Sequence, residues 1–318
     1  MSVLILFSGC KSKKPENVRS MVIFHAGSLS IPFRAVAAEY EKRHPGVKIL
    51  MEPAGSLVCA RKITEMKKPC DIIASADYFV INEFIVPEHS DWSIRFATNE
   101  IVIAFRKNAK YSSEIDSSNW MDILLRDDVT YARSDPDSDP CGYRSVLAFR
   151  LAEKYYGREG LADMLTSKDR EFIRPKEADL VSLVESNAVD YMLQYKSVAI
   201  QHNLEYIKLP DHINLGNPGM NDIYKGVTTD VTGTSPGSRI CVRGEYINYS
   251  IAVLSDSHEK DLAVDFVAFL ISSEGRRIFK DSGQDPIVPF ITEQPEKLPL
   301  RLLRFLNTDK QGEYRNEI

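Results

Sequence analysis

Cysteine is scarce in this chain of 318 residues, and its five cysteines form no metal-binding or redox motif. No two of them have the CxxC spacing found in zinc ribbons and thioredoxin-like enzymes. The six histidines lie in unrelated contexts, and no HExxH motif is present. Gly233 and Gly237 do not form a dinucleotide fingerprint, because no helical pattern follows them. The sequence therefore lacks the common zinc, dithiol and dinucleotide motifs.

The chain also lacks an excess of positive charge, since its formal net charge is −5. Bulk binding of nucleic acid needs a basic face, so we expect no nucleic-acid partner. The same balance means that any bound anion would be held by local hydrogen-bond donors rather than by a positive field.

Long apolar runs are missing beyond the N-terminus, and no later segment is long enough to span a membrane. The hydrophobic content of 43% and the charged content of 27% are ordinary for a soluble globular protein. The length allows two domains with a sizeable core.

The N-terminus carries a short apolar run at residues 3–7, followed by Ser8, Gly9 and Cys10. An apolar run that ends in small residues and cysteine resembles the lipobox of bacterial lipoproteins. We therefore expect Cys10 to be lipidated and residues 1–20 to be a lipoprotein signal and tether. The alternative is an ordinary first strand that ends at a free cysteine.

Residues 22–33 predict a strand, a tight turn and a helix. Val22, Ile23 and Phe24 suit a buried strand, and apolar residues from 33 to 40 follow at helical spacing. A turn of this kind at Gly27 and Ser28 directs free backbone N–H groups toward one point, which makes an anion site. The alternative is that a serine hydroxyl simply caps the helix.

The same arrangement recurs along the chain. A strand at 47–51 leads into a turn at Ser56 and a helix, and a strand at 71–74 leads into a helical stretch through residue 84. This alternation predicts an α/β protein with a parallel sheet covered by helices. The apolar strand at 100–105 suits a crossing into a second domain, and the strand at 249–254 suits the return.

The second domain is expected to repeat the strand-to-helix turn twice, at residues 139–142 and at Glu177. We expect residues 211–245 to be surface loops, one helix to run from 263 to near 283, and a last helix at 300–305. Ligands of open α/β sheets bind beyond the carboxyl ends of the strands. The four turns, at Gly27 and Ser28, Ser56, 139–142 and Glu177, are therefore predicted to line a cleft between two domains.

Five sequence motifs point to a known family. They are Phe-His-Ala-Gly-Ser-Leu (24–29), Ala-Ser-Ala-Asp-Tyr (74–78), Ser-Asp-Pro with Asp-Pro-Cys-Gly-Tyr-Arg-Ser (134–136 and 139–145), Arg-Pro-Lys-Glu (174–177) and Tyr-Lys-Ser-Val-Ala (195–199). Together, over residues 21–285, the chain resembles the substrate-binding proteins of molybdate/tungstate ABC transporters, of the type common in archaea. One difference is a shorter connection at residues 165–172.

The resemblance implies a two-domain type II periplasmic binding protein fold with the ligand in the interdomain cleft. Domain I would comprise residues 21–100 and 252–318, and domain II residues 101–251. Matching motifs place the ligand contacts at Gly27, Ser28, Ser56, Asp139, Pro140, Cys141, Glu177 and Tyr195. Asp139 and Glu177 would approach the metal atom of the oxyanion itself. No cofactor is implied, since molybdate or tungstate is the ligand.

Electrostatics makes these two carboxylates informative. A carboxylate about 4 Å from a dianion is repelled by roughly 4 kcal/mol per pair of unit charges at an effective dielectric constant near 20. A sulfate or phosphate site would avoid such residues or hold them protonated, whereas a hard metal centre accepts carboxylate oxygen as a ligand. The alternatives are that Asp139 is a turn residue before proline and that Glu177 is a favoured acid in a first helical turn.

We therefore expect an extracytoplasmic, membrane-anchored lipoprotein that captures molybdate or tungstate and delivers it to an ABC permease with its ATPase subunit. A receptor for sulfate, phosphate or ferric iron on the same fold is the near alternative. An enzyme with a Cys141 nucleophile and His25 as its partner is a second alternative, and a sensor module is a third. A disulfide between Cys59 and Cys70 is conceivable outside the cytoplasm.

Overall fold

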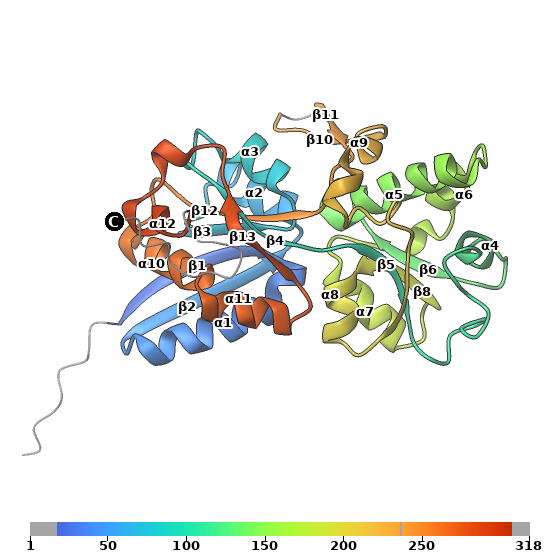
Figure 1. Ribbon diagram of the computed structural model, residues 1–318, viewed down its shortest axis with the longest axis horizontal. Helices are drawn as coiled ribbons and strands as arrows, with labels where there is room; N and C mark the ends of the chain where they lie inside the picture. The colour runs from blue at the N-terminus through green and yellow to red at the C-terminus, as the bar shows by residue number, and fades with distance from the viewer. Residues whose placement is uncertain (1–17, 236, 307–318) are drawn as a thin grey trace, which may run out of the picture.

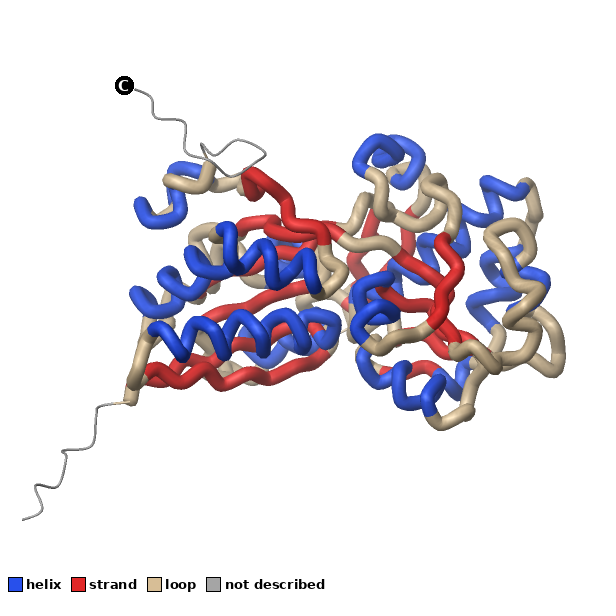
Figure 2. The backbone as a smooth tube through the Cα atoms, turned by 60° about the horizontal axis from the view of Figure 1, so that its bottom comes forward, coloured by secondary structure: helices blue, strands red, loops and turns tan. Residues whose placement is uncertain are grey.

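Two separate β-sheets, each with its own helices, lie side by side in the computed structural model (Figure 1). The structure describes residues 18–235 and 237–306. In Figure 2, viewed from a direction 60° away, helices lie over the strands of both groups. We call the group built on the six-stranded sheet lobe I and the group built on the five-stranded sheet lobe II. A search of the described helices finds none long and apolar enough to cross a membrane.

The sheet of lobe I has the strand order β13-β4-β12-β3-β1-β2. Strand β1, which lies next to the edge strand β2, pairs in parallel with β2 and β3, because both connections contain a helix that packs on the sheet. Helices α1, α10 and α11 pack against one another, and α2 packs against α3. The bounds in lobe I are β1 (Arg19–Ala26), α1 (Ser30–Arg43), β2 (Val47–Ala54), α2 (Ser56–Thr64), β3 (Ile72–Ser75), α3 (Tyr78–Phe84), β4 (Ile94–Thr98), β12 (Asn248–Val253), α10 (Lys260–Leu270), α11 (Ser273–Asp281), β13 (Asp285–Ile291) and α12 (Leu300–Leu303).

The sheet of lobe II has the strand order β7-β6-β8-β5-β9, and its strands β5, β6 and β8 are fully buried. Continuous apolar runs such as Ile-Val-Ile-Ala-Phe are typical of strands that are covered on both faces. The bounds in lobe II are β5 (Ile101–Phe105), α4 (Trp120–Leu124), β6 (Tyr131–Ser134), α5 (Pro140–Tyr156), α6 (Leu161–Ser167), β7 (Ile173–Arg174), α7 (Ala178–Glu185), β8 (Tyr191–Tyr195), α8 (Lys196–Gln201), β9 (Glu205–Lys208) and α9 (Asn221–Tyr224).

The chain crosses between the lobes at two places. Residues 99–100 connect β4 of lobe I to β5 of lobe II, and residues 244–247 lead back into β12 of lobe I. The two crossings form the hinge between the lobes. The division into residues 21–100 with 252–318, and residues 101–251, stays a prediction, and β12 already joins the sheet of lobe I from Asn248.

Two predictions about local structure were wrong. Residues 211–245 are not all loop, because they contain α9 and an antiparallel hairpin of β10 (Thr228–Thr232) and β11 (Arg239–Arg243). Few of the hairpin side chains are buried, so the apolar pattern was weak. The helix expected from 263 to near 283 is two helices, since Ser272 ends α10 and caps α11 by accepting the N–H of Gly275. Strands β4, β9 and β13 were not predicted.

Candidate functional site

The four predicted turns meet between the lobes. Gly27 and Ser28 form a short 3₁₀ turn, η1 (Gly27–Leu29), between β1 and α1, and Ser56 is the first residue of α2. From lobe II, Asp139 precedes α5 and Glu177 precedes α7. All of these residues are buried. The structure thus brings the four turns together, as expected from turns at the carboxyl ends of strands.

Two carboxylates, Asp139 and Glu177, form the centre of this site. Asp139 Oδ2 accepts the backbone N–H of Glu177 at 3.1 Å. Glu177 Oε1 crosses to lobe I and accepts the backbone N–H of Ser28. The second oxygen of each group, Asp139 Oδ1 and Glu177 Oε2, is buried and without a hydrogen-bond partner in the described residues. Each carboxylate is therefore held by one oxygen and has the other free.

Neither carboxylate makes a capping hydrogen bond to its own helix. Both residues occupy the N-cap position of a helix, where an acidic side chain normally accepts an N–H of its own first turn. Asp139 makes no such bond to α5, and Glu177 makes none to α7. Ser28 and Ser30 do not cap α1 either, since the cap residue is Leu29. The capping alternatives are not realised in this structure.

Burial sets the protonation of the pair. It raises the pKa of Asp139 well above its usual range, and the nearby charge of Glu177 raises that pKa further. Burial also raises the pKa of Glu177. Two acids buried close together do not both ionise readily, so the pair favours keeping a proton.

Small residues allow the two lobes to approach this closely. A Cβ on Gly27 would lie 3.0 Å from Glu177 Oε1, and a Cβ on Gly55 would lie 2.3 Å from the carbonyl oxygen of Ser138. The Gly55 turn, which carries Ser56, thus packs directly on the backbone before Asp139. The Ser56 hydroxyl oxygen accepts the N–H of Ala76 at 3.1 Å, which leaves its hydrogen available to donate.

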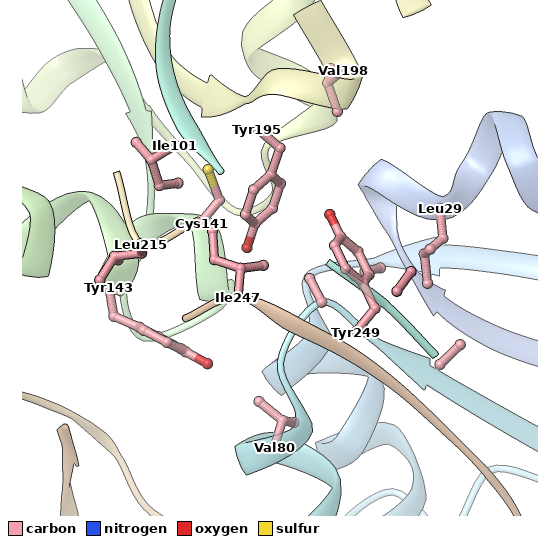
Figure 3. Packing of buried hydrophobic residues seen from close by; sticks show 14 of the residues in the cluster. Leu29, Val80, Ile101, Cys141, Tyr143, Tyr195, Val198, Leu215, Ile247 and Tyr249 are labelled. Carbon is pink, nitrogen blue, oxygen red and sulfur yellow. The ribbon is translucent and has the colours of Figure 1, made fainter. Parts of the chain in front are cut away.

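The predicted contact Tyr195 enters the site from lobe II. It ends β8, it is fully buried, and its hydroxyl has no partner among the described residues. Figure 3 shows its ring near that of Tyr249 on β12 of lobe I, and the ring centroids are 5.8 Å apart. A phenol at this place can donate one hydrogen bond to a ligand between the lobes.

Pro140 and Cys141 begin α5 and are buried beside the site. The Cys141 thiol lies 3.8 Å from the carbonyl oxygen of Leu193. Burial raises its pKa well above the usual value, so it stays a thiol. The proposed partner His25 instead has its Nδ1 at 2.8 Å from the carbonyl oxygen of Ala26, and burial lowers its pKa to about 4. The contacts of the two groups give no support to a cysteine–histidine pair.

A buried ion pair between the lobes was not predicted. Arg144 of α5 lies 2.7 Å from Asp77, which caps α3 of lobe I, and both side chains are almost inaccessible to solvent, at 2% and 5%. The Tyr143 hydroxyl donates to the same oxygen of Asp77 at 2.7 Å. We call these three residues the latch. All three lie within the family motifs at 74–78 and 139–145, but nothing in the sequence indicated their pairing.

Predictions about the other cysteines have different outcomes. Cys59 and Cys70 are both buried and free, so the conceivable disulfide is not formed. Cys10 and residues 1–17 of the predicted signal and tether lie outside the described residues. The end of that prediction was wrong, because Arg19 and Ser20 belong to strand β1.

Solved structures with the same architecture define the class of the fold. The periplasmic molybdate-binding protein of Azotobacter vinelandii superposes with a TM-score of 0.62 at 15% identity, over 83% of this chain and 98% of that one. The sulfate-binding protein SubI of Mycobacterium tuberculosis gives 0.63 at 16% identity, over 85% and 87%. The fold is therefore that of two-domain periplasmic solute-binding proteins, which confirms the predicted fold class.

Sequence relatives then identify the family. Residues 21–284 match the bacterial extracellular solute-binding protein family, and this chain belongs to it. The molybdate/tungstate-binding protein WtpA of Pyrococcus abyssi is 41% identical, over 91% of this chain and 92% of its own length. WtpA of Thermococcus kodakarensis is also 41% identical, over 90% of both chains, and an uncharacterized solute-binding protein of Petrotoga mobilis is 42% identical, over 90% and 89%.

Proposed function

We propose that this protein is an extracytoplasmic receptor that captures molybdate or tungstate between its two lobes and delivers it to an ABC permease with its ATPase subunit. The observation that carries the proposal is the carboxylate pair. Asp139 Oδ1 and Glu177 Oε2 are both buried without a hydrogen-bond partner among the described residues, and the two acids lie close enough for the charge of Glu177 to act on Asp139. WtpA relatives at 41% identity, named for molybdate and tungstate binding, support the same ligand class.

The chemistry of the donors favours an oxyanion with a metal centre. Molybdenum and tungsten in these ions are hard Lewis acids that accept further oxygen ligands, so Asp139 Oδ1 and Glu177 Oε2 can bind the metal itself. The Tyr195 hydroxyl, the Ser28 hydroxyl and the backbone N–H groups of the turns can donate to the oxygens of the ion. Such a set provides carboxylate ligands for the metal atom of the ion and hydrogen-bond donors for its oxygens.

The same carboxylates disfavour sulfate and phosphate. Each ionised carboxylate about 4 Å from a dianion is repelled by roughly 4 kcal/mol for each of the two charges of the ion, at an effective dielectric constant near 20. Sulfur and phosphorus in these ions offer no coordination site that would offset this repulsion. In their ionised form the two carboxylates therefore discriminate against the lighter oxyanions.

Anchoring through Cys10 belongs to the same proposal. Lipidation at Cys10 would leave residues 11–18 as a polar tether between the membrane and β1. The Cys10→Ser variant should then be released from the membrane fraction, and mass spectrometry of the wild-type N-terminal peptide should detect the lipid. A wild-type protein that is not lipidated at Cys10 would refute the anchoring.

Calorimetric titration with tungstate, molybdate, sulfate and phosphate tests the ligand assignment. We expect tight binding of the first two ions and no heat from the others. The Asp139→Asn and Glu177→Gln variants should each bind about 100-fold or more weakly, since each removes a charged ligand worth at least two hydrogen bonds to a charged group. The matched controls Asp179→Asn and Glu185→Gln, both on α7, should bind like the wild type. Sulfate or phosphate binding of similar strength would overturn the proposal.

A further inference from the structure

A chain of hydrogen bonds runs from the hinge to Ser28. Asn99 lies in the first crossing between the lobes, and Tyr249 lies on β12 just after the second crossing. Asn99 Nδ2 donates to the Tyr249 oxygen at 3.1 Å, and the Tyr249 hydroxyl donates to Ser28 Oγ at 3.0 Å. All three side chains are buried. Figure 3 shows Tyr249 in the space between the lobes, opposite Tyr195.

Contacts with the backbone determine which group donates and which accepts in each of these hydrogen bonds. The N–H groups of Glu100 and Ser197 point at Asn99 Oδ1, at 3.0 and 3.3 Å. A backbone N–H can only donate, so this end of the amide is its oxygen and the NH₂ end faces Tyr249. The Tyr249 oxygen therefore accepts from Asn99 and sends its own proton to Ser28. Burial raises the pKa of Tyr249, which keeps this proton in place.

We propose that Asn99 and Tyr249 are positioning residues that hold the Ser28 hydroxyl as a donor toward the bound oxyanion. The inference rests on the proposed function, since it concerns the same site. Because the Ser28 oxygen already accepts from Tyr249, its own hydrogen is free to point at the ligand. Tetrahedral oxyanions without protons have acceptor oxygens only, so a hydroxyl turned the wrong way would contribute nothing to their binding.

A double-mutant cycle tests whether Tyr249 acts through Ser28. We expect Ser28→Ala to weaken tungstate binding about 10- to 100-fold, as loss of one hydrogen bond to a charged group implies. Tyr249→Phe keeps the ring and should weaken binding about 3- to 10-fold in the wild-type background, but less than about 2-fold once Ser28→Ala is present. The control Tyr40→Phe removes a buried hydroxyl bonded to Asp265, and should change stability without changing the affinity.

A second variant, at Asn99, reverses the direction of these hydrogen bonds without removing a side chain from the series. Asn99→Asp still accepts the two backbone N–H groups, but its other oxygen can only accept, so Tyr249 would turn its proton away from Ser28. Asn99→Asp should weaken binding at least as much as Tyr249→Phe. The repulsion between its new charge and the anion should remain in the Ser28→Ala background, whereas the part of the loss that acts through Ser28 should disappear there. If the Tyr249→Phe variant does not fold, the double-mutant cycle of Asn99→Asp with Ser28→Ala tests the positioning role instead.

The outcomes separate this inference from the proposed function. Equal losses with and without Ser28→Ala would overturn the positioning role, while tight tungstate binding by the wild type would still support the receptor. A wild-type protein that binds neither tungstate nor molybdate would refute the receptor and this inference with it. Loss of affinity in Tyr249→Phe that disappears in the Ser28→Ala background would support the positioning role.

Discussion

Asp77→Asn should weaken ligand binding although Asp77 is not among the proposed ligand contacts. The carboxylate joins lobe I to Arg144 and Tyr143 of lobe II, so its contacts exist only when the lobes are closed. Asparagine has nearly the same shape and is as good an N-cap as aspartate, so α3 keeps its cap. The substitution removes the charge opposite Arg144 and leaves the rest of the latch in place.

The structure sets the size of the effect. Removal of one partner of a buried ion pair costs about 3–5 kcal/mol, because the other charge stays buried without compensation. Arg144 keeps a hydrogen bond to the carbonyl oxygen of Glu245 at 3.2 Å, and the amide of the variant can still accept from Arg144. We therefore expect a cost at the lower end of this range, about 3 kcal/mol, which corresponds to a loss of about 100-fold in affinity for the ligand. On the proposal that the lobes close around the ligand, the loss arises because the latch is present only in the closed form that binds it.

Calorimetric affinity for tungstate, together with the unfolding midpoint of the ligand-free protein, tests this reasoning. The double variant Asp77→Asn with Arg144→Met removes both the charge and its partner, and should regain affinity to within about 10-fold of the wild type. The reasoning is refuted if Asp77→Asn binds as the wild type does. It is also refuted if the ligand-free variant loses stability by the full amount, since the pair would then support the fold rather than closure.

Further predictions concern the carboxylate pair, the contact between the lobes and the thiols. The raised pKa of Asp139 stabilises the closed ligand-free form below its unfolded value of 3.8, and this contribution is lost as the pH rises through the raised pKa. Asp139→Asn should therefore raise the unfolding midpoint by an amount that grows with pH, equivalent to about 1–2 kcal/mol near neutrality; a constant difference would contradict this. Gly55→Ala should prevent full closure, because its Cβ would lie 2.3 Å from the carbonyl oxygen of Ser138, and calorimetry should find at least about 10-fold weaker binding with unchanged ligand-free stability. Among the described cysteines only Cys241 is exposed, so a thiol reagent should modify it quickly and the buried Cys59, Cys70 and Cys141 only after unfolding; rapid modification of Cys141 would argue against the closed packing described here.

Much of the fold could be predicted because its signals are local. The run at β5 is apolar throughout and the structure buries every residue of it, and the turn before α5 carries proline at the first helical position. The missed elements have weak local signals. Strand β13 contains two prolines, and only Phe290 in it is buried, so nothing in the alternation of its residues indicates a strand. Its place at the sheet edge depends on β4, which is nearly 200 residues earlier in the chain.

The candidate site likewise has features that could be predicted from the sequence and features that could not. The turns at Gly27 and Ser28, Ser56, Asp139 and Glu177 could be found from sequence, because a strand, small or capping residues and a helix follow one another within a few positions. Which carboxylate oxygen is held and which is free could not, since Glu177 is fixed by an N–H of the other lobe, 149 positions away. The latch and the Asn99–Tyr249–Ser28 chain are invisible for the same reason.

The sequence by itself determined the α/β rhythm, the positions of the anion-binding turns and the residue types available to them, because helix periodicity, apolar runs and turn chemistry act over a few residues. Only the tertiary structure decided that Asp139 and Glu177 are buried close together, that Arg144 pairs with Asp77 and that Asn99 directs the proton of Tyr249. These relations depend on burial and on contacts between distant segments, and both are set when the two lobes pack together.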